Sequence, residues 1–345
     1  MNEQAKIDRT DAKILRRLLS ESRTSFTDIA AECGITVAAV RMRYKKLWKD
    51  GIINGEKMLV NPHCLGYPYI VDLGIVTDVA NEKKVAFFLE SKNYMSQITG
   101  RQGKYAFYSK VALQDLNKLH QITEDLEENP LIKKVDALIW SEAAYIEYPE
   151  NLIIGTDDFF PKKKNYVPPK NIKNAVELDE TDKKMAKILA ENSRISFEEI
   201  SKNLQITSKT VVRRYKKLRE SVLTLSTVTV NLNKLGYNAL ANMYIDVSNG
   251  SKISEIKTKL LEIPNLIVII NLIGAHNLYC GLVLENFEKL FQANERLRSI
   301  NGIESTTLNL GRAPVAWPLN LFPSLLEKES MPKYWRPNDN NPLSK

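Results

Sequence analysis

The first 60 residues place apolar side chains at helical spacing in three short segments. Residues 9–20 carry one apolar stripe, which predicts a helix. A second helix is expected to start after Ser25, because a serine hydroxyl can cap a helix by accepting hydrogen bonds from its first backbone N–H groups. Residues 33–35 contain a glycine turn, and Thr36 is placed to cap a third helix. The remaining part, 52–60, predicts a short two-stranded wing.

Residues 61–150 show a different pattern, in which β-branched segments alternate with two amphipathic segments. The order predicts the ferredoxin-like βαββαβ plan, a sheet with two helices on one face. The expected elements cover 69–76, 82–91, 95–99, 105–111, 113–126 and 135–140. Because a sheet buries its helix-free face only against another layer, two such sheets are expected to pair.

The chain repeats itself. A shift of 171 positions places residues 8–47 on residues 179–218, and nearly half of the aligned positions are identical, including Ser22-Arg23 on Ser193-Arg194. This period is far longer than that of a solenoid, so a tandem duplication of a two-part unit is predicted. The second βαββαβ part is expected at 239–247, 254–261, 267–272, 279–284, 287–297 and 305–310.

These patterns predict an α+β chain of two winged helix-turn-helix domains, each followed by a ferredoxin-like domain. The Pro- and Lys-rich linker is expected to be extended and to span about 50 Å. The expected boundaries are 1–60 and 177–230 for the winged helix-turn-helix domains, 61–150 and 231–326 for the βαββαβ domains, 151–176 for the linker, and 327–345 for a disordered tail.

Charge separates along the same boundaries. The chain has a formal net charge of +8; residues 1–60 and 177–230 are basic, whereas residues 61–150 are net acidic. A polyanion is therefore the expected partner. Three scattered cysteines and three scattered histidines predict no disulfide framework, metal site or cofactor, and favour a cytoplasmic location. No apolar run approaches the ~18 residues of a membrane span, so no membrane is expected as a partner.

The third helix of each repeat carries a cluster of basic side chains. In a helix-turn-helix this helix enters the major groove of double-stranded DNA. A solvated basic helix is the alternative, but a second copy with the same basic pattern favours DNA. We predict phosphate contacts from Arg43, Lys45, Lys46, Arg214, Lys216 and Lys217, and base contacts from Arg41, Met42, Lys209 and Arg213. The wider predicted interface adds Thr36, Val37, Ala38, Thr207, Ser208 and Val212.

A family resemblance follows from the motifs Ile7-Asp8-x-x-Asp11, Ser22-Arg23, Gly34-Ile35-Thr36, Val40-x-x-Arg43 and Asp50-Gly51-Ile52-Ile53. Together they resemble the helix-turn-helix of the Lrp/AsnC transcription regulators. The βαββαβ part is similar to that family's ligand-sensing and oligomerisation domain, so the resemblance covers about 6–148 and 177–312. It implies DNA binding, homo-oligomers formed through the βαββαβ domains, and a small-molecule effector.

The chain departs from the family pattern in carrying two units instead of one. The resemblance therefore implies an intramolecular pseudo-dimer, and unlike third helices imply asymmetric half-sites. The second turn after the third helix is expected to differ, because Ser221-Val222 stands where the first repeat has Asp50-Gly51.

The family's Gly-x-x-Asp turn lies beside an amino-acid pocket. Here the matching turns, 103–106 and 274–277, lack the acidic residue, so an amino acid is not the expected effector. The candidate effector contacts are Gly103, Lys104, Tyr105, Gly274, His276 and Asn277.

Common catalytic motifs are missing, so a non-enzymatic function is expected. Two other functions remain open at this point. One is a nucleoid-type DNA-compacting protein with little sequence preference. The other is a tetrapyrrole enzyme similar to the sirohaem decarboxylases, for which Arg101, Lys104 and His276 are the only candidate residues.

Overall fold

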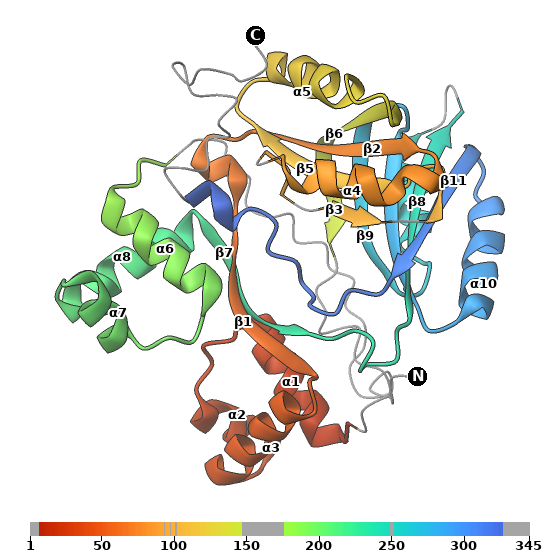
Figure 1. Cartoon of the computed structure of the whole chain (residues 1–345). Coiled ribbons are helices and arrows are strands. Elements are labelled where there is room, and N and C mark those ends of the chain that lie inside the picture. The colour runs from red at the N-terminus through yellow and green to blue at the C-terminus, as the bar shows by residue number, and fades with distance from the viewer. Residues whose placement is uncertain are drawn as a thin grey trace.

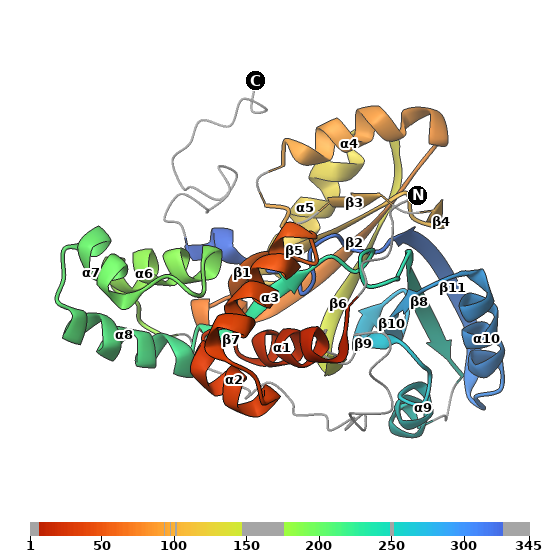
Figure 2. The same cartoon turned by 90° about the horizontal axis from the view of Figure 1, so that it is seen from below.

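The computed structural model describes residues 7–92, 94–96, 98–100, 102–146, 176–248 and 252–326. The predicted linker, apart from its last residue, and the predicted tail lie outside this range. So does Arg101, one of the three residues considered for a tetrapyrrole enzyme. Within it, two helix-turn-helix units lie side by side at one end of the molecule, and a large curved sheet with its helices forms the other end (Figures 1 and 2).

The first helix-turn-helix forms where its caps predict it. Helices α1 (Arg9–Ser20), α2 (Phe26–Cys33) and α3 (Val37–Lys49) follow one another. Asp8 caps α1, and Ser25 and Thr36 accept from backbone N–H groups at the starts of α2 and α3. Gly34 ends α2 in the left-handed conformation that glycine adopts without a steric cost, which turns the chain into α3.

The second helix-turn-helix repeats this plan with α6 (Glu180–Glu191), α7 (Phe197–Leu204) and α8 (Ser208–Glu220). Gln205 takes the left-handed position that Gly34 occupies in the first unit. The turns after the third helices differ as expected: Asp50 has a φ of −77° and is followed by Gly51 at +68°, whereas Ser221, which matches Asp50, has a φ of −132°.

The expectation that residues 52–60 fold back on themselves as two strands is wrong. They form one strand, β1 (Ile53–Val60), and the partner strand is β7 (Leu223–Val230) of the second unit. The pair is antiparallel, with Ile53 opposite Val230 and Val60 opposite Leu223. Each wing therefore satisfies its backbone hydrogen bonds through the other repeat, and the two helix-turn-helix units share one ribbon.

Both βαββαβ domains form in the predicted order. The first contains β2 (Tyr69–Thr77), α4 (Glu82–Glu90), β3 (Ile98–Gly100), β4 (Gln102–Gly103), β5 (Phe107–Leu113), α5 (Asn117–Glu127) and β6 (Ile132–Ile146). The second contains β8 (Ala239–Val247), α9 (Ile253–Leu260), β9 (Leu266–Gly274), β10 (Leu278–Leu284), α10 (Phe287–Arg298) and β11 (Ile303–Arg312). Residues 100, 102 and 103, which lie between the expected strands 95–99 and 105–111, are strand as well, and the expected strand 135–140 runs further at both ends.

These corrections share one cause, because the two domains join edge to edge. The nine strands run in the order β3-β5-β2-β6-β9-β10-β8-β11-β4. The long β6 pairs with β9, and the short β4 pairs with β11. Since β3 and β4 lie next to each other along the chain, the sheet curves back toward its own start. The helix-free faces point inward and share one cluster: Tyr105, Tyr108, Leu138, Tyr244, Ile270 and Leu272.

A strap formed by residues 313–326 returns from β11 to the helix-turn-helix units, drawn in dark blue in Figure 1. Trp317 pairs with Val230 of β7 through two backbone hydrogen bonds. The Asn320 side chain accepts from the Val60 N–H of β1 at 3.2 Å. The strap thus joins the sheet to both strands of the ribbon. Shorter 3-10 turns occur at η1 (Pro62–Leu65), η2 (Val79–Asn81) and η4 (Pro323–Leu326).

Candidate nucleic-acid interface

The predicted DNA-reading side chains lie on the outer faces of α3 and α8. Val40 and Leu47 of α3, like Val211 and Leu218 of α8, are buried, which fixes the opposite face toward solvent. Met42 is 66% exposed on this outer face. The other exposed members of the predicted interface are Thr36, Ala38, Arg41, Lys45, Lys46, Thr207, Ser208, Lys209, Val212, Arg213, Lys216 and Lys217, and Val37 is half-buried.

Arg43 and Arg214 have partners inside their own units. Arg43 Nη1 donates to Asp8 and, at 2.7 Å, to Asp11. Arg214 Nη1 donates in the same way to Asp179 and Asp182. These hydrogen bonds raise the pKa of both guanidinium groups. Each arginine therefore holds its recognition helix against the start of the first helix, and the predicted phosphate contact would have to compete with two carboxylates.

The same aspartates hold one lysine in each unit to different degrees. Lys217 Nζ lies 2.7 Å from Asp182 Oδ2, whereas Lys46 Nζ lies 3.9 Å from Asp11 Oδ2. Lys45 and Lys216 are exposed on the neighbouring face. The predicted phosphate contacts thus divide into two tethered arginines, a tethered Lys217, and three lysines at the surface.

The outer faces of α3 and α8 carry different kinds of side chain at matching positions, which lie 171 residues apart. Arg41 in α3 corresponds to Val212 in α8, and Met42 corresponds to Arg213. Likewise, the small Ala38 corresponds to the cationic Lys209. The units therefore offer one fold with two different sets of donors and apolar groups.

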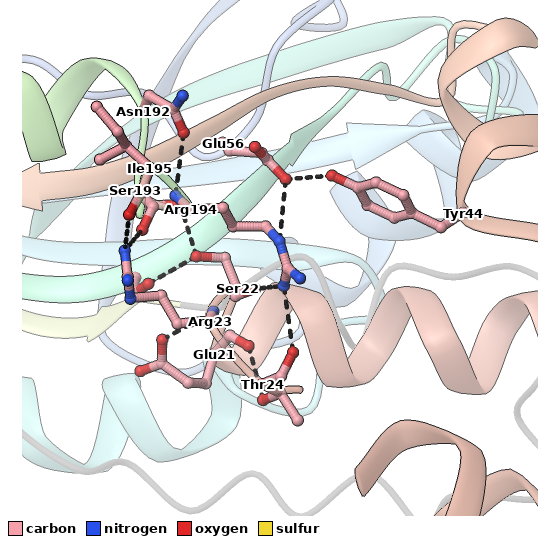
Figure 3. Close-up of polar contacts among 11 residues, drawn as sticks. Glu21, Ser22, Arg23, Thr24, Tyr44, Glu56, Asn192, Ser193, Arg194 and Ile195 are labelled. Atoms are coloured by element: carbon pink, nitrogen blue, oxygen red, sulfur yellow. Dashed lines mark hydrogen bonds and ion pairs between the residues drawn. The ribbon is translucent and has the colours of Figure 1, made fainter. Parts of the chain in front are cut away.

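The junction between the two units is built from the repeated Ser-Arg pairs (Figure 3). Arg23 Nη1 donates to the carbonyl oxygens of Ser193 and Ile195 at 2.6 and 2.8 Å. Reciprocally, Arg194 donates to the carbonyl oxygens of Ser22 and Thr24. The hydroxyl groups of Ser22 and Ser193 lie 2.6 Å apart. A pseudo-two-fold axis thus passes between the two serines.

Aromatic side chains cover both guanidinium groups. Arg23 stacks over Phe197 of α7 at 4.5 Å, and Arg194 stacks over Phe26 of α2 at 4.7 Å. Burial lowers the pKa of Arg23, as expected for a cation removed from water. Because Phe26 and Phe197 begin the second helix of each unit, the junction fixes the two helix-turn-helix units relative to each other.

The candidate effector residues also lie where the two repeats meet, but in the sheet. Gly103 and Gly274 sit at the two strand junctions with φ values of +142° and +139°. An added Cβ would lie 2.5 Å from Leu308 O at Gly103 and 2.4 Å from Ala137 O at Gly274. The glycines are therefore required for the close approach of the strands.

Tyr105 and His276 occupy matching positions and meet each other. Tyr105 Oη lies 3.4 Å from His276 Nε2, and His276 Nδ1 lies 2.8 Å from Asp246 Oδ1. Tyr105 donates to Asp136 at 2.7 Å, and Lys104 lies 3.1 Å from the same carboxylate. The candidate effector residues Lys104, Tyr105 and His276 are thus already joined to protein groups across the sheet.

Burial and hydrogen bonding shift the pKa of Asp136 in opposite directions. Burial alone would raise the pKa of this carboxyl group, but hydrogen bonds from Lys134, Tyr105 and Lys104 lower the pKa to about 2. Asn277, the remaining effector candidate, accepts from the Val247 N–H at 2.8 Å and so fixes the turn before β10. All six candidates therefore contribute to the sheet itself.

The sequence reading missed the structural role of the junction residues. Ser22-Arg23 and Ser193-Arg194 stood out there only as markers of duplication. Their reciprocal contact explains why both residues stay identical between repeats that have otherwise diverged at many positions. An identical polar pair in the turn before the second helix was the available clue.

Within the described ranges, no helix is long and apolar enough to cross a membrane. Among these same residues, no group of three or more histidine, cysteine or acidic side chains is arranged to hold a metal ion.

Comparison with known proteins gives two family matches and several relatives. Residues 7–54 match the winged helix-turn-helix DNA-binding family, and residues 178–219 match the AsnC-type helix-turn-helix domain. The HTH-type transcriptional regulator FL11 of Pyrococcus furiosus is 35% identical over 130 residues, which are 37% of this chain and 85% of the relative. The regulatory protein AsnC of Haemophilus influenzae is 31% identical over 117 residues, 34% of this chain and 78% of the relative.

A similar solved structure extends over both repeats. The crystal structure of the siroheme decarboxylase NirDL matches with a TM-score of 0.63, covering 92% of this chain and 97% of that one. Its sequence is only 16% identical, so this likeness concerns the fold alone. It shows that the tandem arrangement of helix-turn-helix and βαββαβ parts occurs in a solved protein.

Proposed function

The chain belongs to the Lrp/AsnC family of helix-turn-helix transcription regulators, and from this premise we propose that its two units act together as a pseudo-dimeric reader of an operator with unlike half-sites. One observation carries the proposal: two exposed basic recognition helices are held in one chain by a reciprocal junction. Homodimeric helix-turn-helix proteins obtain the same pairing from two chains.

The two helices offer different base-reading chemistry. Arg41 on α3 suits the two acceptors of a guanine in the major groove, and its neighbour Met42 suits the methyl group of a thymine. On α8 the order is reversed, with the apolar Val212 before the cationic Arg213, and Lys209 adds a second cation. A palindromic operator would therefore satisfy at most one of the two helices.

Phosphate contacts are proposed mainly for the surface lysines. Lys45, Lys46 and Lys216 are exposed beside the reading positions, and Lys217 is tethered to Asp182 but remains near the surface. Arg43 and Arg214 are proposed to act chiefly by positioning α3 and α8, since each is bound by two carboxylates. Sequence-independent affinity then comes from lysine and sequence preference from the reading positions.

The remaining parts of the proposal concern regulation and assembly. We place the protein in the cytoplasm as a regulator without enzymatic activity, which associates further through its βαββαβ domains. A small-molecule effector would have to displace the contacts of Lys104, Tyr105 or His276 described above. Both turns, 103–106 and 274–277, lack the acidic residue of the family's amino-acid pocket, so an amino acid is not the proposed effector.

Fluorescence anisotropy tests the proposal against its alternatives. The protein is titrated with the duplex upstream of its own coding sequence and with a scrambled duplex across a series of salt concentrations. Tighter binding to the upstream duplex, with a steep salt dependence, supports a specific regulator. Equal salt-sensitive binding to the upstream and scrambled duplexes supports the nucleoid-type alternative. Absence of binding at low salt, together with binding of an iron-uroporphyrin, supports the tetrapyrrole alternative.

A further inference from the structure

We infer that the junction between the helix-turn-helix units is coded by charge, so that the first unit pairs with the second and not with a second copy of itself. The inference deepens the proposed pseudo-dimer, and it depends on DNA binding only for its consequence at the operator. It follows from comparing junction contacts that obey the pseudo-symmetry with those that break it.

The symmetric contacts stabilise the junction but do not determine which two units pair. Ser22, Arg23 and Phe26 in the first unit have identical counterparts in Ser193, Arg194 and Phe197. Any pairing of units, including two first units or two second units, could form these hydrogen bonds and cation–π contacts. The identical residues therefore cannot decide which unit pairs with which.

The first asymmetric contact is an ion pair across the junction. Arg219 at the end of α8 donates to Glu21 at the end of α1, with 2.9 Å between Nη2 and Oε2. The residues that match them 171 positions away are Trp48 and Asn192, which carry no charge. The attraction therefore occurs on one side of the pseudo-two-fold axis only.

The second asymmetric contact lies on the other side. Glu56 of β1 lies 3.4 Å from Arg194 Nε and accepts a hydrogen bond from Tyr44. Its backbone oxygen accepts from the Ser193 N–H, as the backbone oxygen of Ser226 accepts from the Ser22 N–H. Ser226 is thus the counterpart of Glu56, and its buried, uncharged side chain lies 2.6 Å from Ser22 Oγ.

These contacts have different consequences for the three pairings. Two second units would bring two copies of Arg194 and of Arg219 together, with neither junction carboxylate present. Two first units would place each Glu21 against the uncharged Trp48, although each Glu56 would still meet an arginine, Arg23. Pairing the first unit with the second gives both Glu21 and Glu56 an arginine across the junction. The uncompensated arginines of two second units and the unpaired Glu21 of two first units therefore disfavour both wrong pairings.

The consequence is a fixed order of the two reading helices in one assembly. A chain whose first unit always meets a second unit presents α3 and α8 together, and never α3 twice. It would bind an asymmetric operator in one direction, which gives a regulator a defined orientation relative to the promoter.

Cysteine cross-linking of the full chain tests the pairing without DNA. In a Cys33→Ala background, the double variant Ser22→Cys/Ser193→Cys is oxidised in a glutathione buffer and mapped by mass spectrometry. The 2.6 Å between the serine oxygens suits a disulfide. We expect the 22–193 link in at least about tenfold excess over 22–22 and 193–193 links. Comparable amounts of self-links, or a double variant that stays reduced, would overturn the inference.

Charge reversal then tests whether Glu21 and Arg219 cause the preference. Arg219→Glu in the cross-linking background should lower the equilibrium yield of the 22–193 link about three- to tenfold, and adding Glu21→Arg should restore it. Lys202→Glu is the matched control, since Lys202 forms an exposed ion pair with Glu198 within α7. An unchanged yield in Arg219→Glu would overturn the inference, whereas loss of DNA preference with intact cross-linking would overturn only the proposed operator.

Discussion

The molecule joins its two repeats twice, and the two junctions have diverged differently. Between the helix-turn-helix units, Arg23 and Arg194 make the same contacts in opposite directions. Between the βαββαβ domains, the matching positions hold Tyr105 and His276, each bound to a different carboxylate. If the two helix-turn-helix units bind DNA together, as proposed, the first junction has to keep them in equal geometry, whereas the second has only to close the sheet.

The largest expected effect is at the sheet junction. Gly274→Ala would place a methyl group 2.4 Å from Ala137 O at a φ of +139°, so β6 and β9 cannot keep their register. We expect the free energy of unfolding to fall by about 3 kcal/mol or more. Chemical denaturation measures the loss. Gly100→Ala is the control, since its Cβ would meet Phe107 only at 4.0 Å. Equal effects of the two substitutions would contradict a special role for Gly274.

The next effect concerns the helix-turn-helix junction. Arg23→Ala removes two charge-assisted hydrogen bonds to backbone oxygens and the contact with Phe197. We expect it to destabilise the protein by about 2–3 kcal/mol, and Arg194→Ala to do nearly the same. Thermal unfolding is the measurement, with Arg17→Ala as control because its ion pair is exposed. Very unequal losses of stability in Arg23→Ala and Arg194→Ala would show that the two matching sets of contacts do not stabilise the protein equally.

The sheet junction also predicts a dependence of stability on pH. The pKa of Asp136 is about 2 in the folded protein, below the ~3.9 of an unfolded aspartate. A lowered pKa gives stability that is present above pH ~4 and is lost as the pH falls toward 2, by about 2 kcal/mol. Asp136→Asn should flatten this acid loss in urea titrations at pH 5 and pH 3. Asp78→Asn, at an exposed ion pair, should not, and a similar slope for both variants would refute the assignment.

The two junctions also show how far the sequence could predict this molecule. Apolar periodicity, the helix caps at Ser25 and Thr36 and the repeat predict both helix-turn-helix units, and the alternation of β-branched and amphipathic segments predicts both βαββαβ orders. The partner of β1 and the length of β6 could not be predicted, because their hydrogen bonds go to the other repeat. Local periodicity carries no information about a strand partner that lies far along the chain.

The candidate site was predictable in outline only. Exposure of Arg41 and Met42 follows from the buried positions of α3, and the helical period reveals those positions. The pairing of Arg43 with Asp8 and Asp11 does not follow from that period. It depends on how α3 crosses the start of α1, which is a property of the packed unit. The sequence therefore gives the number of basic residues in a helix, but not which of them are available to contact DNA and which form ion pairs within the protein.

The smallest expected effect concerns the base contacts, which are proposed to differ between α3 and α8 although the junction holds both helices in the same geometry. If the junction presents α3 and α8 alike while their side chains contact different bases, Arg41→Ala should weaken binding to preferred DNA by about 1 kcal/mol and relax selection at one base pair. Lys45→Ala is the matched control on the same helix and should weaken preferred and scrambled DNA alike. Anisotropy titrations of both variants on both duplexes decide between them. Equal losses for Arg41→Ala on the two duplexes would make Arg41 a phosphate contact. The asymmetry of the operator would then have to come from α8 alone, where Val212 holds the matching position and Arg213 carries the charge.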